Sequence, residues 1–295
     1  MGNELKQNRL FFVVILIIAL EAVMFSAGNF KLNSAIKIEE ERGNKIQTAL
    51  QNLPIDAKAV SVYNVTKSKK IYGKNDDIPM PLASLAKTMT VVVALSNHKF
   101  NDIVYIPKGA ISQAGDFGIF QDEKWYMSDL ARATIISSAN DGAYALTGTD
   151  TEFVNEMNAK ARKLGMNNTS FLSPTGLDID LVSPGGVISA SDANTMAMFA
   201  LRAYPQIFSV TTLPEINIVS LSGFNHNFKN TDTIISKIPN LLFSKTGYTT
   251  IAGGNLTVIF KDNRGEEIAI TLLGSTYTSR FSDMENIINV LSRSD

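Results

Sequence analysis

The chain has 295 residues, of which 45% are hydrophobic and 19% charged, and its formal net charge is −1. This size suits one large globular domain with an appendage, and the balanced charge gives no support for a nucleic-acid-binding surface. Cysteine is absent from the sequence, which excludes disulfide bonds and thiolate catalysis. His98 and His226 do not form the H-E-x-x-H pattern of a zinc hydrolase, so no metal or cofactor is expected. A nucleophile in this chain is expected to use a base other than histidine.

The N-terminus combines a basic start with an apolar segment. Lys6 and Arg9 precede an uninterrupted apolar run over 10–20, and small residues follow at 26–28. This layout is typical of an export signal, and the run is only slightly short for a membrane anchor. We expect residues 1–9 to be a short cytoplasmic tail and residues 10–28 a retained anchor, with a cleaved signal peptide as the alternative. Either way, the catalytic part is expected on the extracytoplasmic side of the cell membrane, or secreted if the segment is cleaved.

A charged linker and then a β-hairpin are predicted next. Residues 29–55 are largely charged and polar, and the helical spacing of Ile46 and Leu50 predicts that the linker ends in a helix docked onto the domain. The domain itself is expected to occupy residues 56–295. Alternation over 59–65, a turn at 66–69 and a second strand from residue 70 predict its first hairpin.

A serine and a lysine three positions apart follow this hairpin. On a helix, Ser84 and Lys87 share one face, and Pro81 suits the turn before the helix. The first turn of a helix favours a developing negative charge, which suits a nucleophilic serine. An apolar stripe continues behind the pair at Leu85, Met89, Val92 and Val93 and predicts a buried helix, against which the valine run at 91–93 argues only mildly for a strand. The spacing alone is weak evidence for catalysis, because serine and lysine are both common.

The middle of the chain is predicted to be mostly helical. Residues 103–128 are broken by glycines and read as loop, and Ser128 is expected to cap a helix that leads to the polar segment 137–141. Residues 167–186 are predicted to form a further loop. Helical spacing marks three more segments, at 143–146, 153–164 and 191–203.

The last third is predicted to contain strands and a closing helix. Ser222-Gly223 separates the two strands of a hairpin, and a turn at 261–265 separates two more strands. The segment 241–244 leads into Lys245, and residues 281–291 have the pattern of an amphipathic helix. This order predicts an α+β domain with an antiparallel sheet formed by both chain ends, flanked by helices, and a mostly helical subdomain inserted between them.

Three motifs stand in order along the chain: Ser84-Leu85-Ala86-Lys87, Ser138-Ala139-Asn140 and Lys245-Thr246-Gly247. Together with the segments 81–89, 164–177 and 245–253, they resemble the low-molecular-mass D-alanyl-D-alanine carboxypeptidases, which are serine-type penicillin-binding proteins of bacterial cell-wall metabolism. The resemblance runs from about Ala59 to the final helix. It implies the β-lactamase/DD-peptidase-like fold.

The resemblance also implies a role for each matching residue. The catalytic group would be Ser84 as nucleophile, Lys87 as its base and Ser138 as a proton relay to the departing D-alanine. The N–H groups of Ser84 and Tyr248 would form the oxyanion hole. The substrate-binding residues would be Asn140 at a substrate amide and beside Lys87, Lys245 and Thr246 at the terminal carboxylate, and Gly247 and Tyr248 along the substrate backbone.

The resemblance therefore implies a serine hydrolase that removes the terminal D-alanine from peptidoglycan pentapeptide stems through an acyl-enzyme. Its expected partners are these stems, β-lactam antibiotics as covalent inhibitors, and the membrane through the N-terminal segment, but no nucleic acid. A serine β-lactamase is the first alternative and would need a glutamate for deacylation; Glu152 and Glu156 are nearest in sequence but belong to a helix. A non-catalytic peptidoglycan-binding module is the second alternative, and it would tolerate loss of Lys87 or Ser138.

Overall fold

The computed structural model of the chain describes residues 37–115, 117–148 and 152–293. The chain divides into two compact units, one running to Ala49 and the other from Leu50 to Arg293. Residues 37–51 are helical, which confirms the helix predicted in the linker, whereas its docking stays a prediction. The predicted anchor at 10–28 lies outside the described residues. Within the described ranges, no helix has both the length and the apolar character needed to cross a membrane.

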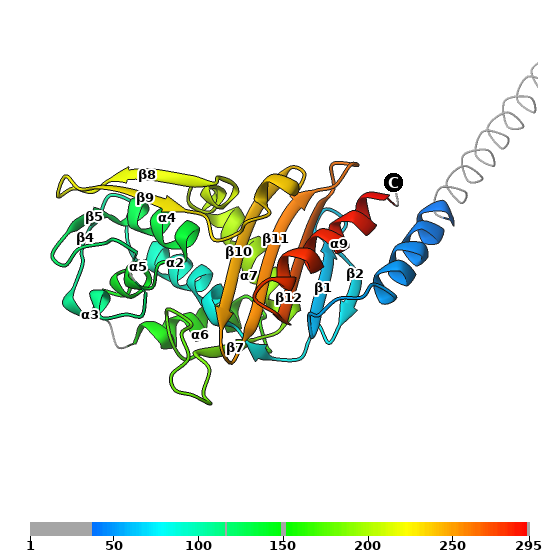
Figure 1. Cartoon of the computed structure of the whole chain (residues 1–295), viewed down its shortest axis with the longest axis horizontal. Coiled ribbons are helices and arrows are strands. Elements are labelled where there is room, and N and C mark those ends of the chain that lie inside the picture. Colours follow the sequence, from blue (N-terminus) through cyan, green and yellow to red (C-terminus); the bar gives the residue numbers. More distant parts are fainter. Residues whose placement is uncertain (1–36, 116, 149–151, 294–295) are drawn as a thin grey trace, which may run out of the picture. The chain divides into compact units, whose positions relative to one another are not determined.

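Both ends of the second unit contribute to one five-stranded antiparallel sheet (Figure 1). The strand order is β10-β11-β12-β1-β2, so the first hairpin pairs with the last strand, in a register that places Val60 opposite Leu272. This confirms the predicted sheet formed by both chain ends. The strands are β1 (Ala59–Asn64), β2 (Lys69–Lys74), β10 (Leu241–Thr249), β11 (Gly253–Lys261) and β12 (Glu267–Ser275).

Helices cover both faces of this sheet. The helix α9 (Ser279–Arg293) packs against β11 and β12, and α7 (Ala190–Ala203) packs against β1 and β12. Because successive side chains of a strand point to opposite faces, the nearly continuous burial of β11 and β12 shows that neither face is open. The strand β10 lies at one edge of the sheet, and this edge packs against the segment that carries Ser84.

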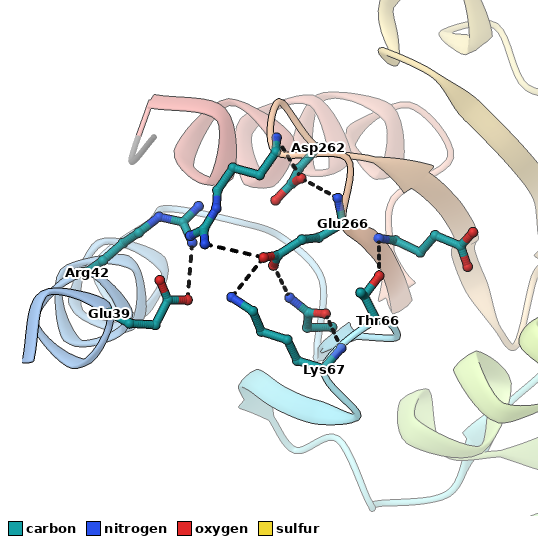
Figure 2. A network of polar contacts seen from close by, with 9 residues as sticks. Glu39, Arg42, Thr66, Lys67, Asp262 and Glu266 are labelled. Carbon is teal, nitrogen blue, oxygen red and sulfur yellow. Dashed lines mark hydrogen bonds and ion pairs between the residues drawn. The ribbon is translucent and has the colours of Figure 1, made fainter. Parts of the chain in front are cut away.

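A polar network ties together the turns at one end of the sheet (Figure 2). The Glu266 carboxylate pairs with Lys67 at 2.8 Å and accepts a hydrogen bond from the Asn64 amide at 2.6 Å. The Glu267 N–H donates to the Thr66 hydroxyl at 2.8 Å. These contacts join the β1–β2 turn to the β11–β12 turn, and so fix the pairing of the two chain ends.

The segment between β2 and β10 forms the inserted subdomain, and its helices confirm most of the predicted pattern. The valine run at 91–93 is buried within a helix, which confirms the buried helix predicted behind Ser84. The larger helices are α2 (Ala86–Asn97), α4 (Met127–Ser137), α5 (Asn140–Ala145) and α6 (Phe153–Lys163), and the shorter ones are η1 (Ala83–Leu85), α3 (Lys108–Ile111), α8 (Pro205–Phe208), η2 (Ser209–Thr212) and η3 (Ile235–Lys237). Its short strands are β3 (Met80–Pro81), β4 (Ile103–Tyr105), β5 (Lys124–Tyr126), β6 (Ser170–Phe171), β7 (Gly186–Ile188), β8 (Glu215–Val219) and β9 (Asn225–Lys229).

Two local predictions in this subdomain were wrong. Residues 103–128 are not simply loop, because β4 and β5 pair there and place Val104 opposite the fully buried Trp125. Ser128 is not a helix cap, since α4 already begins at Met127 and its N-cap is Tyr126. The first error has a tertiary cause: Trp125 is buried against the distant His226 and Phe228, and a short window of sequence does not contain that information.

Candidate active site

Ser84 lies in the single turn η1 that leads into α2. Leu82 and Leu85 are buried in the core, whereas Ser84 is half-buried, so its hydroxyl remains accessible. Ala83 has a φ of +47°, a left-handed conformation that is unfavourable for a residue with a Cβ atom. Gly176 packs directly on it, because a Cβ atom at Gly176 would lie 1.9 Å from the Ala83 carbonyl oxygen. The nucleophile segment is therefore held in a strained turn by close backbone packing.

Asn255 anchors this turn to the sheet. Its side-chain amide donates to the carbonyls of Pro81 and Leu82 at 3.0 and 3.1 Å, and its Oδ1 accepts from the Gly274 N–H at 2.9 Å. Asn255 is completely buried on β11. An unpaired backbone carbonyl is costly in such a site, so the three hydrogen bonds fix the approach to Ser84. This role was not predicted, because a single asparagine in a strand belongs to no recognisable motif.

Lys87 is fully buried and directly contacts the serine. Its Nζ donates to Ser84 Oγ at 2.9 Å and to the Thr175 carbonyl at 2.6 Å. Burial lowers the pKa of Lys87 to about 7, although the nearby Asp141 acts in the opposite direction. A large fraction of Lys87 is therefore neutral near pH 7, and a neutral amine is able to take a proton from Ser84.

Ser138 and Lys245 form a second hydrogen-bonded pair. Ser138 follows the last residue of α4 with a φ of +61°, a conformation that residues other than glycine and asparagine rarely adopt. Lys245 is buried in β10, and its Nζ donates to Ser138 Oγ at 2.9 Å and to the Thr246 carbonyl at 2.8 Å. The strained backbone of Ser138 places its hydroxyl against the third motif.

The two lysines lie close enough to influence each other electrostatically. Burial lowers the pKa of Lys245 well below its usual value, and the positive charges of Lys87 and Arg280 lower it further, against the opposing effect of Asp232. The site therefore contains two lysines whose charged forms are both disfavoured. An anion entering the site would relieve this, because it stabilises the protonated amine.

The edge of β10 passes beside the nucleophile. Built on Gly247, a Cβ atom would lie 3.3 Å from the Ser84 nitrogen, so a side chain here would crowd the backbone of the nucleophile. Arg280 donates to the Gly247 carbonyl at 2.7 Å and stacks on the ring of Tyr277. The half-exposed Tyr248 ring meets Tyr277 edge-on, with the centroids 4.9 Å apart. These contacts hold the end of β10 in place.

Asn140 is the first residue of α5 and is buried. Its amide nitrogen donates to the Ala114 carbonyl at 2.7 Å. No hydrogen bond joins Asn140 to Lys87 within the described part of the chain, where Lys87 instead contacts Ser84 and Thr175. In the same part of the chain, Oδ1 of Asn140 is buried without a partner. This acceptor is unusual for a folded interior and suits a ligand N–H.

The loop after α6 supplies contacts that the sequence did not reveal. The Thr175 carbonyl accepts from Lys87, and the Asp178 carboxylate accepts from the Thr249 hydroxyl at 2.9 Å and from the Ile251 N–H at 3.3 Å. The loop thus links the base on α2 to the end of β10. A backbone carbonyl acts whatever its side chain is, so residue type alone does not identify the Thr175 contact.

The fold therefore brings the three motifs together as two hydrogen-bonded pairs beside a strand edge. A serine hydroxyl next to a buried, largely neutral lysine is equipped for covalent catalysis, with the lysine as general base. Lys245 and the hydroxyl groups of Ser138 and Thr246 belong to the same site and are equipped to hold an anion. This combination defines the class of serine hydrolases that work through an acyl-enzyme with a lysine base.

Comparison with known proteins identifies the family. The family model described as D-alanyl-D-alanine carboxypeptidase matches residues 45–276. A D-alanyl-D-alanine endopeptidase of Pseudomonas aeruginosa is 32% identical in an alignment of 231 positions that covers 73% of this chain and 70% of that protein. A D-alanyl-D-alanine carboxypeptidase of Bacillus subtilis is 29% identical over 79% of this chain and 61% of that protein.

Solved structures agree with this result. Penicillin-binding protein D2 of Listeria monocytogenes, in its ampicillin-bound form, superposes with a TM-score of 0.70 at 29% identity, covering 81% of this chain and 98% of that chain. The chain belongs to the D-alanyl-D-alanine carboxypeptidase family. It is a serine-type peptidase with the α+β fold of the penicillin-binding DD-peptidases.

Proposed function

We propose that this protein removes the terminal D-alanine from peptidoglycan stem peptides through an acyl-enzyme on Ser84. The observation that carries the proposal is the 2.9 Å hydrogen bond between Ser84 Oγ and the Nζ of Lys87, a fully buried amine whose pKa is lowered to about 7. The family of the chain and the carboxypeptidases and endopeptidases among its relatives support the same substrate class.

In the acylation step, Lys87 takes the proton of Ser84 as Oγ attacks the carbonyl of the penultimate D-alanine. The N–H groups of Ser84 and Tyr248 stabilise the negative charge that forms on the carbonyl oxygen. When the intermediate collapses, the C–N bond breaks and the amine of the departing D-alanine receives a proton through Ser138. Water then attacks the ester, which frees the shortened stem and restores the serine.

Substrate recognition uses the third motif. Lys245 and Thr246 bind the terminal carboxylate, which gives specificity for a free C-terminus. The substrate backbone pairs with the outer edge of β10 at Gly247 and Tyr248, and the unpaired Oδ1 of Asn140 accepts a substrate N–H. The same arrangement is compatible with endopeptidase cleavage, in which the substrate is a cross-linked peptide.

The geometry favours a peptidase over a β-lactamase. Glu152 precedes α6 and Glu156 lies on it; both are exposed, and they accept hydrogen bonds from Asn155 and Asn97, respectively. Among the glutamates of the described ranges, the one that is buried is Glu123, whose partner at 2.6 Å is His226. None of these three carboxylates is hydrogen-bonded to Ser84 or Lys87 in the described structure, so none of them is placed to drive deacylation of a bound β-lactam.

The direct test incubates the purified full chain with a D-Ala-D-Ala-ended pentapeptide and, separately, with penicillin. We expect catalytic release of D-alanine from the peptide and no rapid turnover of the drug. Rapid penicillin hydrolysis would support the β-lactamase. If the folded protein neither releases D-alanine nor reacts with penicillin, the result supports a non-catalytic peptidoglycan-binding module.

Replacing Lys245 with alanine is expected to impair free-carboxylate peptides much more than their C-terminal amides. A charge-assisted contact to a carboxylate contributes roughly 1.5–3 kcal/mol, which corresponds to about a ten- to hundredfold loss in kcat/KM. The measurement is kcat/KM for the matched acid and amide substrates. An equal loss for both would assign Lys245 to the chemistry or to the fold instead of to carboxylate recognition.

The family acts on the bacterial cell wall outside the cytoplasm, and we propose that residues 10–28 hold this protein in the membrane with the catalytic unit on that side. The support is the apolar run over 10–20 behind Lys6 and Arg9. The full chain is then expected to stay with membranes during alkaline extraction, and its release as a shortened protein would indicate a cleaved signal instead.

A further inference from the structure

Thr231 lies beside the residues proposed to bind the carboxylate, on the segment between β9 and β10. Its hydroxyl oxygen is 2.5 Å from the hydroxyl oxygen of Thr246. Its backbone N–H donates to the Ile136 carbonyl at 3.3 Å, two residues before Ser138. Thr231 therefore bridges the strand of the third motif and the helix end that carries the second. Within the described residues, its hydroxyl makes no other hydrogen bond.

The fold fixes the backbone on both sides of Thr231. The side chain of Asn230 donates to two backbone carbonyls at 2.7 and 2.9 Å and accepts from the Asp232 N–H at 2.9 Å. The buried Asp232 carboxylate accepts in turn from the hydroxyl of Ser244 on β10. The segment is thus attached to β10 independently of Thr231, so the Thr231 hydroxyl is in place before any substrate binds.

The number of hydroxyl protons determines which of the two threonines donates the hydrogen bond. A hydroxyl has one proton to donate, whereas a carboxylate accepts hydrogen bonds and donates none. When a carboxylate binds at Thr246, the Thr246 proton must point to it, so the bond between the two threonines is retained only if Thr231 donates. We propose that Thr231 is a positioning residue that donates to Thr246 and thereby orients the Thr246 proton toward the substrate carboxylate. This inference rests on the proposed role of Thr246.

Donation from Thr231 to Thr246 also favours a substrate with a free C-terminal carboxylate over the corresponding amide. A hydroxyl that accepts one hydrogen bond becomes a better donor in the next, and the bond to a charged acceptor gains most. A C-terminal amide brings its own N–H donors, so Thr246 can accept from the substrate and donate to Thr231 instead. Thr231 is consequently required as a donor for the free acid and not for the amide.

The experiment compares the full-chain protein with Thr231→Val, which keeps the shape but removes the donor, and with Thr231→Ser, which keeps the hydroxyl. Thr233→Val is the matched control, because Thr233 is exposed in the same segment. Thr231→Val is expected to raise KM for a D-Ala-D-Ala-ended peptide about five- to tenfold, the value of one hydrogen bond, with little change in kcat or in kcat/KM for the amide. Thr231→Ser is expected to restore the KM, and Thr233→Val to match the wild type.

Two failures are distinguishable. If the wild type releases no D-alanine, the proposed function is wrong. If the wild type is active but Thr231→Val affects acid and amide equally, or affects neither, the positioning role is overturned and the proposed function stands. Thermal unfolding of each variant identifies a loss of fold. Were Thr231→Val unable to fold, the acid-to-amide ratio of Thr231→Ala would decide the question in the same way.

Discussion

Replacing Ser84 with alanine is expected to reduce kcat by about 10⁴-fold or more while the protein remains folded. The loss is this large because no acyl-enzyme forms without the nucleophile. The effect on the free energy of unfolding should be small, since Ser84 is half-buried and Lys87 keeps its hydrogen bond to the Thr175 carbonyl. D-alanine release, measured beside a thermal unfolding curve, tests both statements.

The same substitution should abolish covalent labelling by penicillin. Penicillin carries a strained amide and a carboxylate, so Ser84 is expected to attack it and Lys245 to hold it. Ring opening leaves the leaving group attached, where it obstructs water. Intact-mass spectrometry should show the wild type plus one whole penicillin for minutes, and no addition to Ser84→Ala. Wild-type-level turnover or labelling of the folded variant would remove Ser84 from the mechanism.

Substitution of Lys87 is expected to have the second largest effect. Lys87→Gln keeps a polar side chain that reaches toward Ser84 but cannot accept its proton, so kcat/KM should fall by about 10²–10⁴-fold, the usual range for a general base. In the wild type, the active form is the neutral amine. Because the pKa of Lys87 is about 7, kcat/KM should rise with pH and level off above about pH 7.

The stability of the protein provides the control for this pH profile. A lysine whose folded pKa lies below its ordinary value of 10.5 makes the free energy of unfolding rise between about pH 7 and pH 10.5, where the unfolded chain binds more protons. Below pH 7 the lysine is protonated in both states, and its contribution to stability no longer changes. Loss of activity below pH 7 with an unchanged melting temperature therefore reports the base, and a flat profile would contradict this role of Lys87.

The sequence predicted the regular elements and the three motifs much better than the contacts around them. The hairpin at 59–74 and the helix predicted at 153–164 follow from local signals, namely alternation in the first and helical spacing in the second; the helix is followed by Gly165, which has a φ of +77°. The pairing of β4 with β5 depends on burial of Trp125, which a short window of sequence does not contain. Local patterns therefore gave the elements, and tertiary packing decided the exceptions.

The candidate site divides in the same way. Ser84, Lys87, Ser138 and Lys245 were predicted as a set, and the structure places them in two hydrogen-bonded pairs. The contacts of Asn255 and of the Thr175 carbonyl were not predicted, because they join residues far apart in sequence through backbone atoms. Thr231 was missed for a related reason: its partner belongs to a motif, but Thr231 itself lies outside every motif.

The pairing of β1 with β12 has a consequence for how this protein is made. Val60 pairs with Leu272, so this contact forms only after more than two hundred intervening residues have been synthesised. The entropic cost of closing so long a loop slows folding. Until the loop closes, the unpaired strands can pair with wrong partners. During synthesis the nucleophile segment emerges early, yet the sheet edge it needs is among the last parts to appear. We expect a nascent chain that stops before β12 to be a target for proteolysis and unable to react with penicillin.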